Sequence, residues 1–567
     1  MKKIFIFLMI FISLLSFGAD EVKNHITGQF ELLKAGKNFT SNKDGIVTFS
    51  LNQKINSGGA RELIVLNQTK PVPIEFGAES KLDRDLEGGA GAAYSVYADI
   101  IYTDKTVTYH VIVPFSTKAH DWELKKRVFV PRKPIAKVSY YLLFRNRPAG
   151  IAQFRNPFLR EIPQPKKITL SGAVDKADAL YKIGETAVFS FDITEGDKPL
   201  KKGKITLNLT YDGRKVIEKK EFDLAQSQKI SLSGKLDKPG FLRCDADITI
   251  GGKRYSKTLR AGFDVNNITL GIKEPADFDK FWQNALAQTA AMPLDLKIEQ
   301  LPEYSKGLTN AYKLSVAAPE KRIYGFLRVP KAKGKYPLIV TVPGAGPGVD
   351  RPPAKEYAKA ATLIANIHGY DPMQPGKKII DLYREVTRRG HYAWRGYDTP
   401  QQSYFYPAIL GINRMIDYVI SREDIDENRL GYDGISQGGG FGFILCGIVP
   451  NRFKTAVFNV PALCDLNGFR LGRNSGWPLF NEKMGNRANM NTRYYDAGYF
   501  AARIGADTEI VVIVGLSDNV CCASSIYAAY NQLKVKNKKI INEIGMGHEQ
   551  RGNYYAAISA MLKKLQK

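Results

Sequence analysis

A glycine–serine motif is the feature that most constrains how this chain folds. Gly434-Ile435-Ser436-Gln437-Gly438 follows a strand-like run, residues 430–433, and leads into the glycine-rich, helix-like residues 439–445. A serine at a sharp strand–turn–helix junction, with glycines two residues before and after it, is typical of a nucleophile elbow. With 50 glycines among 567 residues, the spacing alone gives roughly 0.2 chance matches per chain. The motif therefore needs support from the rest of the sequence.

The distribution of histidines supplies a base for this serine. In α/β-hydrolases the chain order is serine, then Asp or Glu, then histidine. Of the six histidines only His548 follows Ser436, and it lies in a glycine-containing loop before the helix-like residues 554–565. A lone histidine in a loop is more often a surface residue. Because His548 is the sole candidate at the expected place, we interpret it as the general base.

The acid must lie between Ser436 and His548. Asp518 follows the apolar, β-branched run 509–515, which predicts a buried parallel strand. Catalytic groups gather beyond the carboxyl ends of such strands, so Asp518 is the best-placed acid, with a plain turn residue as the alternative. Asp507 and Glu509 would lie at the wrong end of that strand. The other candidates are Asp465, Glu482, Asp496 and Glu543.

Two backbone amides are candidates for an oxyanion hole. One is the N–H of Gln437, directly after the serine. Residues 336–342 predict an earlier strand, and the loop Pro343-Gly344-Ala345-Gly346-Pro347-Gly348 follows it. Glycines allow close approach of a substrate to the backbone, which favours the N–H of Ala345 as the second donor. A simple Gly/Pro turn is the alternative.

From about residue 272 to residue 567 the chain resembles the acetyl xylan esterase / cephalosporin C deacetylase family of α/β-hydrolases. The likeness rests on Asp277–Trp282, Ile323–Pro330, Ser421–Leu430, Ser436–Gly440, Gly515–Asp518, Tyr527–Asn531 and Gly547–Glu549. The resemblance implies a serine carboxylic ester hydrolase that releases acetyl groups from xylan-like polysaccharide or oligosaccharide, with no cofactor and no metal. It places Ser436, Asp518 and His548 at the triad positions. The amides of Ala345 and Gln437 take the oxyanion positions.

The chain departs from that family in three places. Pro343-Gly344-Ala345 stands where His-Gly-Tyr is usual, Cys521-Cys522-Ala523 replaces a common Cys-Pro-Pro run, and residues 392–396 match a Tyr-Arg-Gly segment only loosely. The missing aromatic after Gly344 leaves a wider acyl pocket. A bulkier sugar ester of feruloyl type, or a peptide, is therefore an alternative substrate. A glycan-binding protein with a vestigial hydrolase domain is a third hypothesis.

The sequence before the hydrolase-like region predicts a signal peptide and two β-rich domains. Residues 1–19 read as a signal peptide, which indicates a secreted or periplasmic protein, and no other stretch has the length of a membrane span. Residues 20–165 predict a jelly-roll-like β-sandwich that loosely resembles carbohydrate-binding modules. Residues 166–266, after the linker Pro163–Lys167, predict an Ig-like β-sandwich that acts as a spacer. Residues 267–567 form the predicted α/β-hydrolase domain.

Aromatic residues are candidates for contacts with sugar, although core packing is the more frequent role of each one singly. In the first sandwich Trp122, Tyr94, Tyr97 and Tyr109 are candidates for a glycan platform. In the hydrolase domain Trp394, Tyr404, Phe405 and Trp477 are candidates for the wall of the sugar pocket.

Charge and cysteine content limit the other functions. The net charge of +26 fits a lysine-rich, well-solvated surface, with attraction to an anionic glycan as the functional alternative. The lysines are dispersed and form no basic helix, which argues against nucleic acid. Five scattered cysteines predict no disulfide framework, leave a Cys446–Cys464 bridge open, and form no zinc motif.

Overall fold

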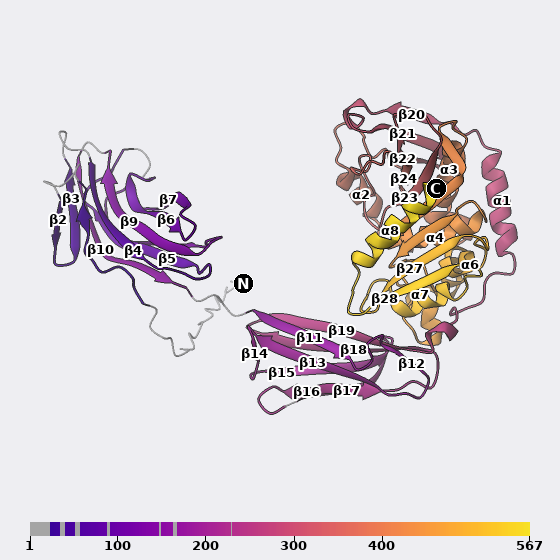
Figure 1. The fold of residues 1–567 in the computed structure, drawn as a ribbon, viewed down its shortest axis with the longest axis horizontal. Coiled ribbons are helices and arrows are strands. Elements are labelled where there is room, and N and C mark those ends of the chain that lie inside the picture. The colour runs from indigo at the N-terminus through magenta and orange to yellow at the C-terminus, as the bar shows by residue number, and fades with distance from the viewer. Residues whose placement is uncertain are drawn as a thin grey trace, which may run out of the picture. The chain divides into compact units, whose positions relative to one another are not determined.

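The structure is a computed structural model that describes residues 23–33, 40–51, 57–87, 91–146, 149–162, 167–227 and 229–567. The predicted signal peptide, residues 1–19, and the linker residues 163–166 lie outside the described residues. The chain divides into two compact units, between Lys166 and Lys167 (Figure 1). Each unit is described by itself below. The predicted boundary between residues 266 and 267 falls inside the second unit.

The first unit contains two five-stranded sheets. The strand order in one sheet is β1 (Glu31–Leu32), β4 (Ser57–Val65), β9 (Ile135–Arg145), β6 (Tyr94–Tyr102) and β7 (Val107–Pro114). The order in the other is β2 (Thr40–Lys43), β3 (Ile46–Leu51), β10 (Gly150–Glu161), β5 (Ile74–Leu82) and β8 (His120–Phe129). Apolar residues alternate along these strands, so each sheet presents one apolar face. Those faces contribute to a single buried core, with Val96 from one sheet and Phe154 from the other.

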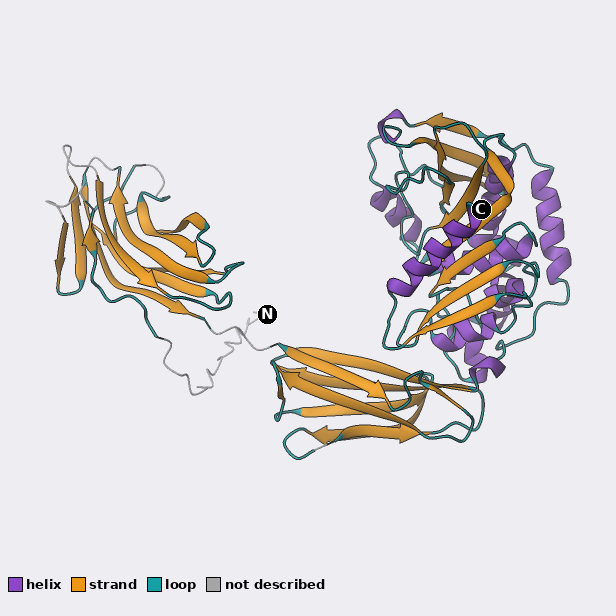
Figure 2. Cartoon of the chain, in the orientation of Figure 1, coloured by secondary structure: helices purple, strands orange, loops and turns teal. Residues whose placement is uncertain are grey.

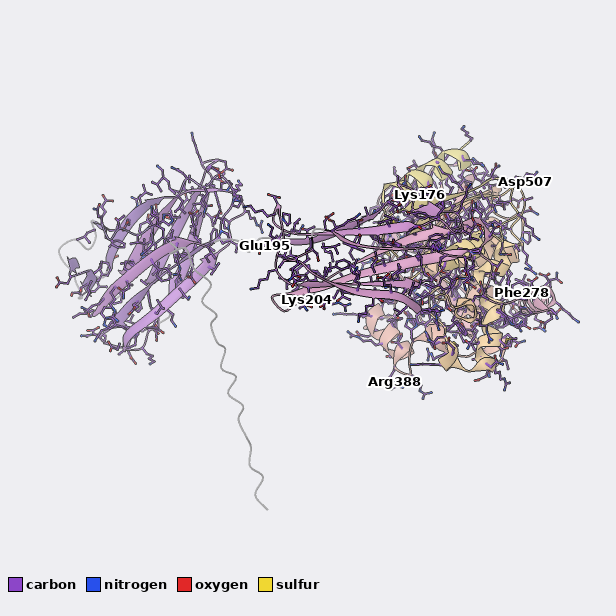
Figure 3. All side chains as sticks on the ribbon, turned by 90° about the horizontal axis from the view of Figure 1, so that it is seen from below. Lys176, Glu195, Lys204, Phe278, Arg388 and Asp507 are labelled. Atoms are coloured by element: carbon purple, nitrogen blue, oxygen red, sulfur yellow. The ribbon has the colours of Figure 1, made fainter. Side chains whose placement is uncertain are left out.

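The second unit begins with two further sheets. One contains β11 (Ile168–Val174), β13 (Ala187–Glu195), β14 (Lys198–Pro199) and, paired with β13, β17 (Ile230–Gly234). The other has the order β12 (Leu180–Tyr181), β19 (Lys253–Phe263), β18 (Gly240–Ile250), β15 (Lys204–Tyr211) and β16 (Lys215–Asp223). Residues of both sheets share one core. Figure 3 places Glu195 and Lys204 at the end of these strands that lies away from the helical region.

A nine-stranded sheet forms the centre of the rest of the second unit. Its order is β20 (Lys297–Gln300), β21 (Thr309–Ala318), β22 (Lys321–Pro330), β24 (Ala361–Ala365), β23 (Tyr336–Val342), β25 (Ile425–Ile435), β26 (Thr455–Asn459), β27 (Glu509–Gly515) and β28 (Lys538–Glu543). The strands from β24 to β28 pair in parallel, while β20, β21 and β22 pair antiparallel at one edge. The carboxyl ends of the parallel strands therefore meet at one edge of the sheet, where catalytic side chains can converge.

Helices surround this sheet (Figure 2). They are α1 (Phe278–Ala290), α2 (Ile379–Thr387), α3 (Phe405–Ile420), α4 (Gln437–Ile448), α5 (Asn486–Asn491), α6 (Ala497–Ala501), α7 (Ala523–Tyr530) and α8 (Gly552–Leu565). Helix α4 is buried along almost its whole length because its glycines permit close contact with the strands. A Cβ atom added at Gly442 would lie 2.4 Å from the ring of Phe458 on β26. Among the described residues, no helix is long and apolar enough to cross a membrane.

The earlier sheets of the second unit share a core with the helical region. Phe241 of β18 and Val265 belong to the same buried cluster as the residues of the nine-stranded sheet. The ring of Phe241 lies 5.9 Å from that of Tyr527 on α7. An exposed ion pair, Arg214–Glu482 at 2.6 Å, joins the same two parts. This continuous packing fixes the position of the sandwich strands against the loops at the end of β27.

Candidate active site

Ser436 lies at a strained turn between β25 and α4. Its backbone has φ 56° and ψ −121°, a conformation that side chains other than glycine rarely adopt. Cβ atoms added at Gly434 and Gly438 would lie 2.4 Å from the Gly438 oxygen and 2.0 Å from the Val342 oxygen. Gly438 is therefore required by the close contact with β23, and Gly434 by the close contact with the backbone of Gly438. The N–H of Ser436 donates to the Asn459 oxygen at 2.9 Å, which connects the turn to the end of β26.

The structure brings Ser436, His548 and Asp518 together in one hydrogen-bonded chain. The distance from Ser436 Oγ to His548 Nε2 is 2.9 Å, and that from His548 Nδ1 to Asp518 Oδ2 is 2.8 Å. Because a carboxylate only accepts, Nδ1–H donates to Asp518 and Nε2 is left to accept from the serine hydroxyl. Asp518 is fully buried, while 28% of the His548 side chain is exposed. This is the geometry that a serine nucleophile and its general base require.

Asp518 is held in one orientation by its own turn. Its second oxygen, Oδ1, accepts the backbone N–H groups of Val520 at 2.7 Å and Cys521 at 3.0 Å. Of the other carboxylates, Asp507 is paired with Lys536 and precedes β27. Asp496 is also buried, and burial raises its pKa to about 7, but it accepts backbone N–H groups of a separate turn. Among the described carboxylates, Asp518 is the one that hydrogen-bonds His548.

The two predicted oxyanion donors lie in different settings. Gln437 is buried as the first residue of α4, where backbone N–H groups lack partners inside the helix and attract negative charge. Ala345 is exposed in the loop between Pro343 and Val349, which we name the oxyanion loop. Neither amide donates a hydrogen bond to another described residue. Both are therefore available for an oxyanion.

Buried polar side chains form hydrogen bonds with the backbone of the oxyanion loop. The side chain of Gln437 accepts from the Tyr392 hydroxyl at 2.6 Å and donates to the Pro343 oxygen at 3.2 Å. At the far end of the loop, Asn366 both accepts from and donates to the backbone of Val349, at 2.9 Å each. The glutamine after the nucleophile therefore contributes its side chain as well as its amide.

His368 holds the middle of the same loop. Its Nε2 lies 2.8 Å from the Gly346 oxygen and its Nδ1 lies 2.7 Å from the Tyr404 hydroxyl. Because a carbonyl only accepts, Nε2 carries the hydrogen and Nδ1 accepts from Tyr404. Burial lowers the pKa of His368 to about 4, so the imidazole stays neutral at ordinary pH. The Tyr370 hydroxyl adds a bond to the Pro347 oxygen at 2.5 Å.

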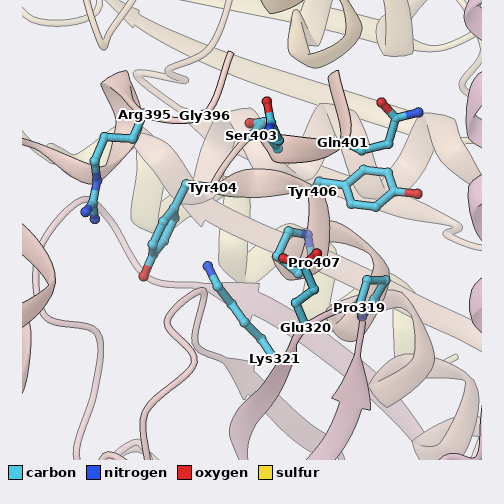
Figure 4. A pocket seen from close by; sticks show the side chains of 11 residues that line it. Pro319, Glu320, Lys321, Arg395, Gly396, Gln401, Ser403, Tyr404, Tyr406 and Pro407 are labelled. Carbon is cyan, nitrogen blue, oxygen red and sulfur yellow. The ribbon is translucent and has the colours of Figure 1, made fainter. Parts of the chain in front are cut away.

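A cavity of about 400 Å³ borders Tyr404 (Figure 4). Figure 4 shows Lys321 and Arg395 on either side of Tyr404. The Lys321 Nζ atom lies 3.7 Å from the centre of the Tyr404 ring, and burial lowers the pKa of Lys321 to about 8. Tyr404 therefore lines this cavity, and its hydroxyl is committed to His368.

The other aromatic candidates have diverse roles. Phe405 is fully buried in the core, so the prediction that it lines a pocket is wrong. Trp477 is half-buried, and its carbonyl accepts from Leu463 N–H at 2.9 Å in the segment that follows β26. Trp394 is 37% exposed and donates to the Pro478 oxygen. These two tryptophans remain candidates for contacts with a sugar.

In the first unit, the four aromatic candidates differ in how accessible their rings are. Tyr94 is fully buried in the core, so its prediction as a glycan platform is wrong. The guanidinium of Arg155 lies 4.1 Å from the centre of the Trp122 ring and covers it. Tyr109 is 68% exposed, and Tyr97 is half-buried.

Two cysteines lie in the turn that carries Asp518, and one of them belongs to a group of residues that could hold a metal ion. All five cysteines are buried and free, so the Cys446–Cys464 bridge is absent. Among the described residues, the group able to hold a metal ion is Asp518, Cys521 and His548, whose ligand atoms lie within 4.8 Å of one another. Two of these three side chains, Asp518 and His548, are already hydrogen-bonded to each other, and His548 is also hydrogen-bonded to Ser436.

Sequence reasoning missed two side chains that support the site, His368 and Arg260. His368 directly follows the strand-like run that ends in β24, and its position after a parallel strand was an available signal. Arg260 of β19 is 1% exposed and donates to the loop that carries Asp518. No local pattern distinguishes Arg260 from the many other basic residues of the β-rich segments.

Comparison with known proteins identifies the family. The profile of the acetyl xylan esterase (AXE1) family matches residues 270–565. Acetyl esterase Axe7A of Xylanibacter ruminicola is 29% identical over 376 residues, which cover 65% of this chain and 84% of that protein. Acetyl xylan esterase from Paenibacillus sp. R4 has a TM-score of 0.45 and 23% identity, and the match covers 53% of this chain and 98% of that chain. Acetyl xylan esterase 1 from Thermoanaerobacterium sp. JW/SL YS485 has a TM-score of 0.43 and 22% identity, and the match covers 53% of this chain and 97% of that chain. Since the family profile spans more than half of the chain, the protein belongs to the acetyl xylan esterase family and is a carboxylic ester hydrolase.

Proposed function

We propose that the protein removes acetyl groups from an acetylated, xylan-like polysaccharide or oligosaccharide through an acyl-enzyme. The hydrogen-bonded chain from Ser436 through His548 to Asp518 carries this proposal, together with membership of the acetyl xylan esterase family. Serine esterases use these groups to split one difficult hydrolysis into two easier steps.

The reaction begins when Ser436 Oγ attacks the ester carbonyl and His548 Nε2 takes the serine proton. The amides of Ala345 and Gln437 stabilise the oxyanion of the tetrahedral intermediate. When the intermediate collapses, His548 returns the proton to the departing sugar oxygen. Water then attacks the acetyl-enzyme, again with His548 as base, and acetate leaves as Ser436 regains its proton. Asp518 orients His548 and stabilises the imidazolium in both steps.

Acetate release from a panel of acetylated polysaccharides tests this function, with Ser436→Ala as the decisive variant. We expect Ser436→Ala to lower kcat by at least about 10⁴-fold, since the covalent route is lost. Unchanged acetate release in a folded Ser436→Ala variant would falsify the catalytic assignment. Activity on the panel also identifies the polysaccharide.

A bulkier acyl group is the second candidate for the same site. Ala345 is exposed at the position where relatives usually carry a tyrosine, and a methyl group occupies far less of the acyl pocket than a phenol ring. Rates on matched acetyl and feruloyl sugars separate the two candidates. Faster turnover of the feruloyl ester would favour the bulkier acyl group as the substrate of the site.

The architecture proposed for this activity contains three domains. Residues 20–165 form a jelly-roll-like sandwich, residues 166–266 an Ig-like sandwich, and residues 267–567 an α/β-hydrolase domain. The five consecutive parallel strand pairs around β25 support the last assignment. Export, to the periplasm or the medium, is part of the proposal through residues 1–19. Amino-terminal sequencing of the mature protein tests it, and an intact Met1 would contradict export.

The first sandwich is proposed to bind an anionic glycan, with Tyr97 and Tyr141 as its platform. These residues pair across β6 and β9, and their rings are 5.6 Å apart. Arg145 and Arg61 lie 6.0 Å from the two rings and add positive charge. Retention of Tyr97→Ala on acidic polysaccharide should fall at low salt, whereas Trp122→Ala, whose ring is covered, should be retained like the wild type. Equal retention of both variants at two salt concentrations would exclude this platform.

A further inference from the structure

We propose that strand β19 of the Ig-like sandwich positions the catalytic acid, with Arg260 as the positioning residue. This inference rests on the proposed role of Asp518 in catalysis. It gives the sandwich a part in the chemistry of the esterase, in place of the spacer role that its sequence favours.

Four side-chain hydrogen bonds connect β19 to the turn that follows β27, the longest from Asn519 Nδ2 to Thr258 Oγ1 at 3.4 Å. Arg260 Nη1 donates to the Leu516 oxygen at 2.9 Å, and Arg260 Nη2 donates to Asn519 Oδ1 at 2.8 Å. Ser517 Oγ donates to the Thr258 oxygen at 2.8 Å. The contacted residues, Leu516, Ser517 and Asn519, lie immediately before and after Asp518.

The setting of Arg260 is unusual for an arginine of a spacer domain. Its side chain is 1% exposed, and the buried carboxylate of Asp212 attracts its charge without a hydrogen bond to it. Instead the guanidinium uses two of its N–H groups on the acid turn, and its planar fork fixes two acceptors at once. Burial of a charge is costly unless its hydrogen bonds are made, so displacement of the turn from β19 is disfavoured.

Two N–H groups of its own turn orient the Asp518 carboxylate, and contacts to two other parts of the molecule hold the turn as a whole. Within the hydrolase domain, the Leu516 and Ser517 N–H groups donate to the oxygens of Glu543 and Met546. These two bonds join the turn to β28 and to the loop of His548. The β19 contacts restrain the opposite side of the same turn, and the hydrogen bond from His548 Nδ1 to Asp518 Oδ2 at 2.8 Å requires both sides to be fixed.

A second group of contacts secures the sandwich at this place. Asp212, which follows β15, accepts from Ser524 Oγ on α7 at 2.6 Å and from the Asn474 N–H at 2.9 Å. Asn474 in turn donates its side-chain N–H to the Asp212 oxygen at 2.7 Å. Asp212 also attracts the buried charge of Arg260, so Arg260→Met affects this anchor as well, whereas changes at Ser517 and Asn519 leave the Asp212 hydrogen bonds in place.

Two full-length variants test the inference from opposite sides of the contact. Arg260→Met removes the donors on β19 and keeps a linear apolar side chain. The double variant Ser517→Ala/Asn519→Ala removes the partners on the acid turn and leaves the sandwich intact. We expect both to lower kcat by about 10- to 100-fold, because a shift of about 1 Å in a catalytic group has that effect, with KM changed less than about 2-fold. Asn519→Asp, which still accepts from Arg260, should lose much less kcat than Asn519→Ala.

The pH profile separates positioning from general destabilisation. A displaced Asp518 stabilises the imidazolium less, so the acid limb of kcat/KM should move to lower pH in both variants. Arg254→Met, on the same strand but 72% exposed and paired with Asp247, is the matched control and should match the wild type in kcat and pH profile. If Arg260→Met does not fold, the kcat and pH profile of the double variant Ser517→Ala/Asn519→Ala test the inference. Wild-type kcat and acid limb in a folded double variant would overturn the inference, while loss of activity in Ser436→Ala alone would leave the proposed function standing.

Discussion

The oxyanion loop and the acid turn lie on either side of Ser436, and they are stabilised in different ways. The oxyanion loop is held by side chains of the hydrolase domain itself, with His368 at 2.8 Å from the Gly346 oxygen. The acid turn, residues 515–522, is held in part by strand β19 of the earlier sheets, with Arg260 at 2.9 Å from the Leu516 oxygen. The first support comes from a residue 22 positions away in sequence and the second from one 256 positions away.

This difference teaches that the two loops depend on different parts of the second unit. The oxyanion loop is held by side chains of the region around the nine-stranded sheet. The acid turn also contacts strand β19, and the shared core around Phe241 keeps the sheet of β19 in place. Changes to the two loops should therefore affect different kinetic parameters.

Removal of the charge on the acid should have the largest effect. Asp518→Asn should lower kcat by about 10⁴-fold, because an amide favours the wrong tautomer of His548 while the geometry stays intact. Steady-state kinetics on a soluble acetyl ester at pH 7 measures it. A loss of less than 10-fold would mean that another group orients His548.

Loosening of the oxyanion loop should have the next largest effect. His368→Phe keeps the ring packing but removes the bond to Gly346, and it should lower kcat by about 10²-fold through a misplaced Ala345 amide. Tyr370→Phe removes one bond from the same loop and serves as the graded comparison, with a smaller loss. If His368→Phe raised KM and left kcat unchanged, the loop would act in substrate binding rather than on the oxyanion.

The same histidine predicts how stability depends on pH. The pKa of His368 is lowered to about 4 by burial, so the unfolded chain takes up its proton first as the pH falls. Its contribution to stability is fully present above pH 6.5 and is lost between about pH 6.5 and 4. From pH 7 to pH 5 the free energy of unfolding should fall by about 2 kcal/mol through His368. Urea unfolding of wild type and His368→Gln at both pH values measures it, and an equal fall in the two would contradict the assignment.

Filling the acyl pocket should give the smallest effect. Ala345→Tyr restores the side chain that relatives carry, and it should lower turnover of feruloyl esters relative to acetyl esters by roughly 10-fold, through steric exclusion. The measurement is the ratio of kcat/KM values for the two esters of one sugar. An unchanged ratio would place the acyl group elsewhere in the site.

The sequence predicts the positions of strands more accurately than it predicts which of their faces are buried, for physical reasons. Alternation of apolar and polar residues predicts strands over residues 93–102 and 186–193, and β6 and β13 match these ranges to within two residues, because period-two patterns are local. The same alternation could not tell which face of a strand is covered. Tyr94 therefore proved to be core, and the ring of Trp122 lies against Arg155 of β10.

The sequence by itself determined the turn at Ser436 and the histidine that we propose as the base. Glycines at 434 and 438 are dictated by backbone contacts of 2.4 and 2.0 Å, and a single histidine follows the serine. Only the tertiary structure decided what holds the two loops. His368, Gln437 and Arg260 act through hydrogen bonds to backbone oxygens, and any residue can offer such an oxygen. Which oxygen a buried donor meets depends on how sheets and domains pack, and no local pattern of residue types records that packing.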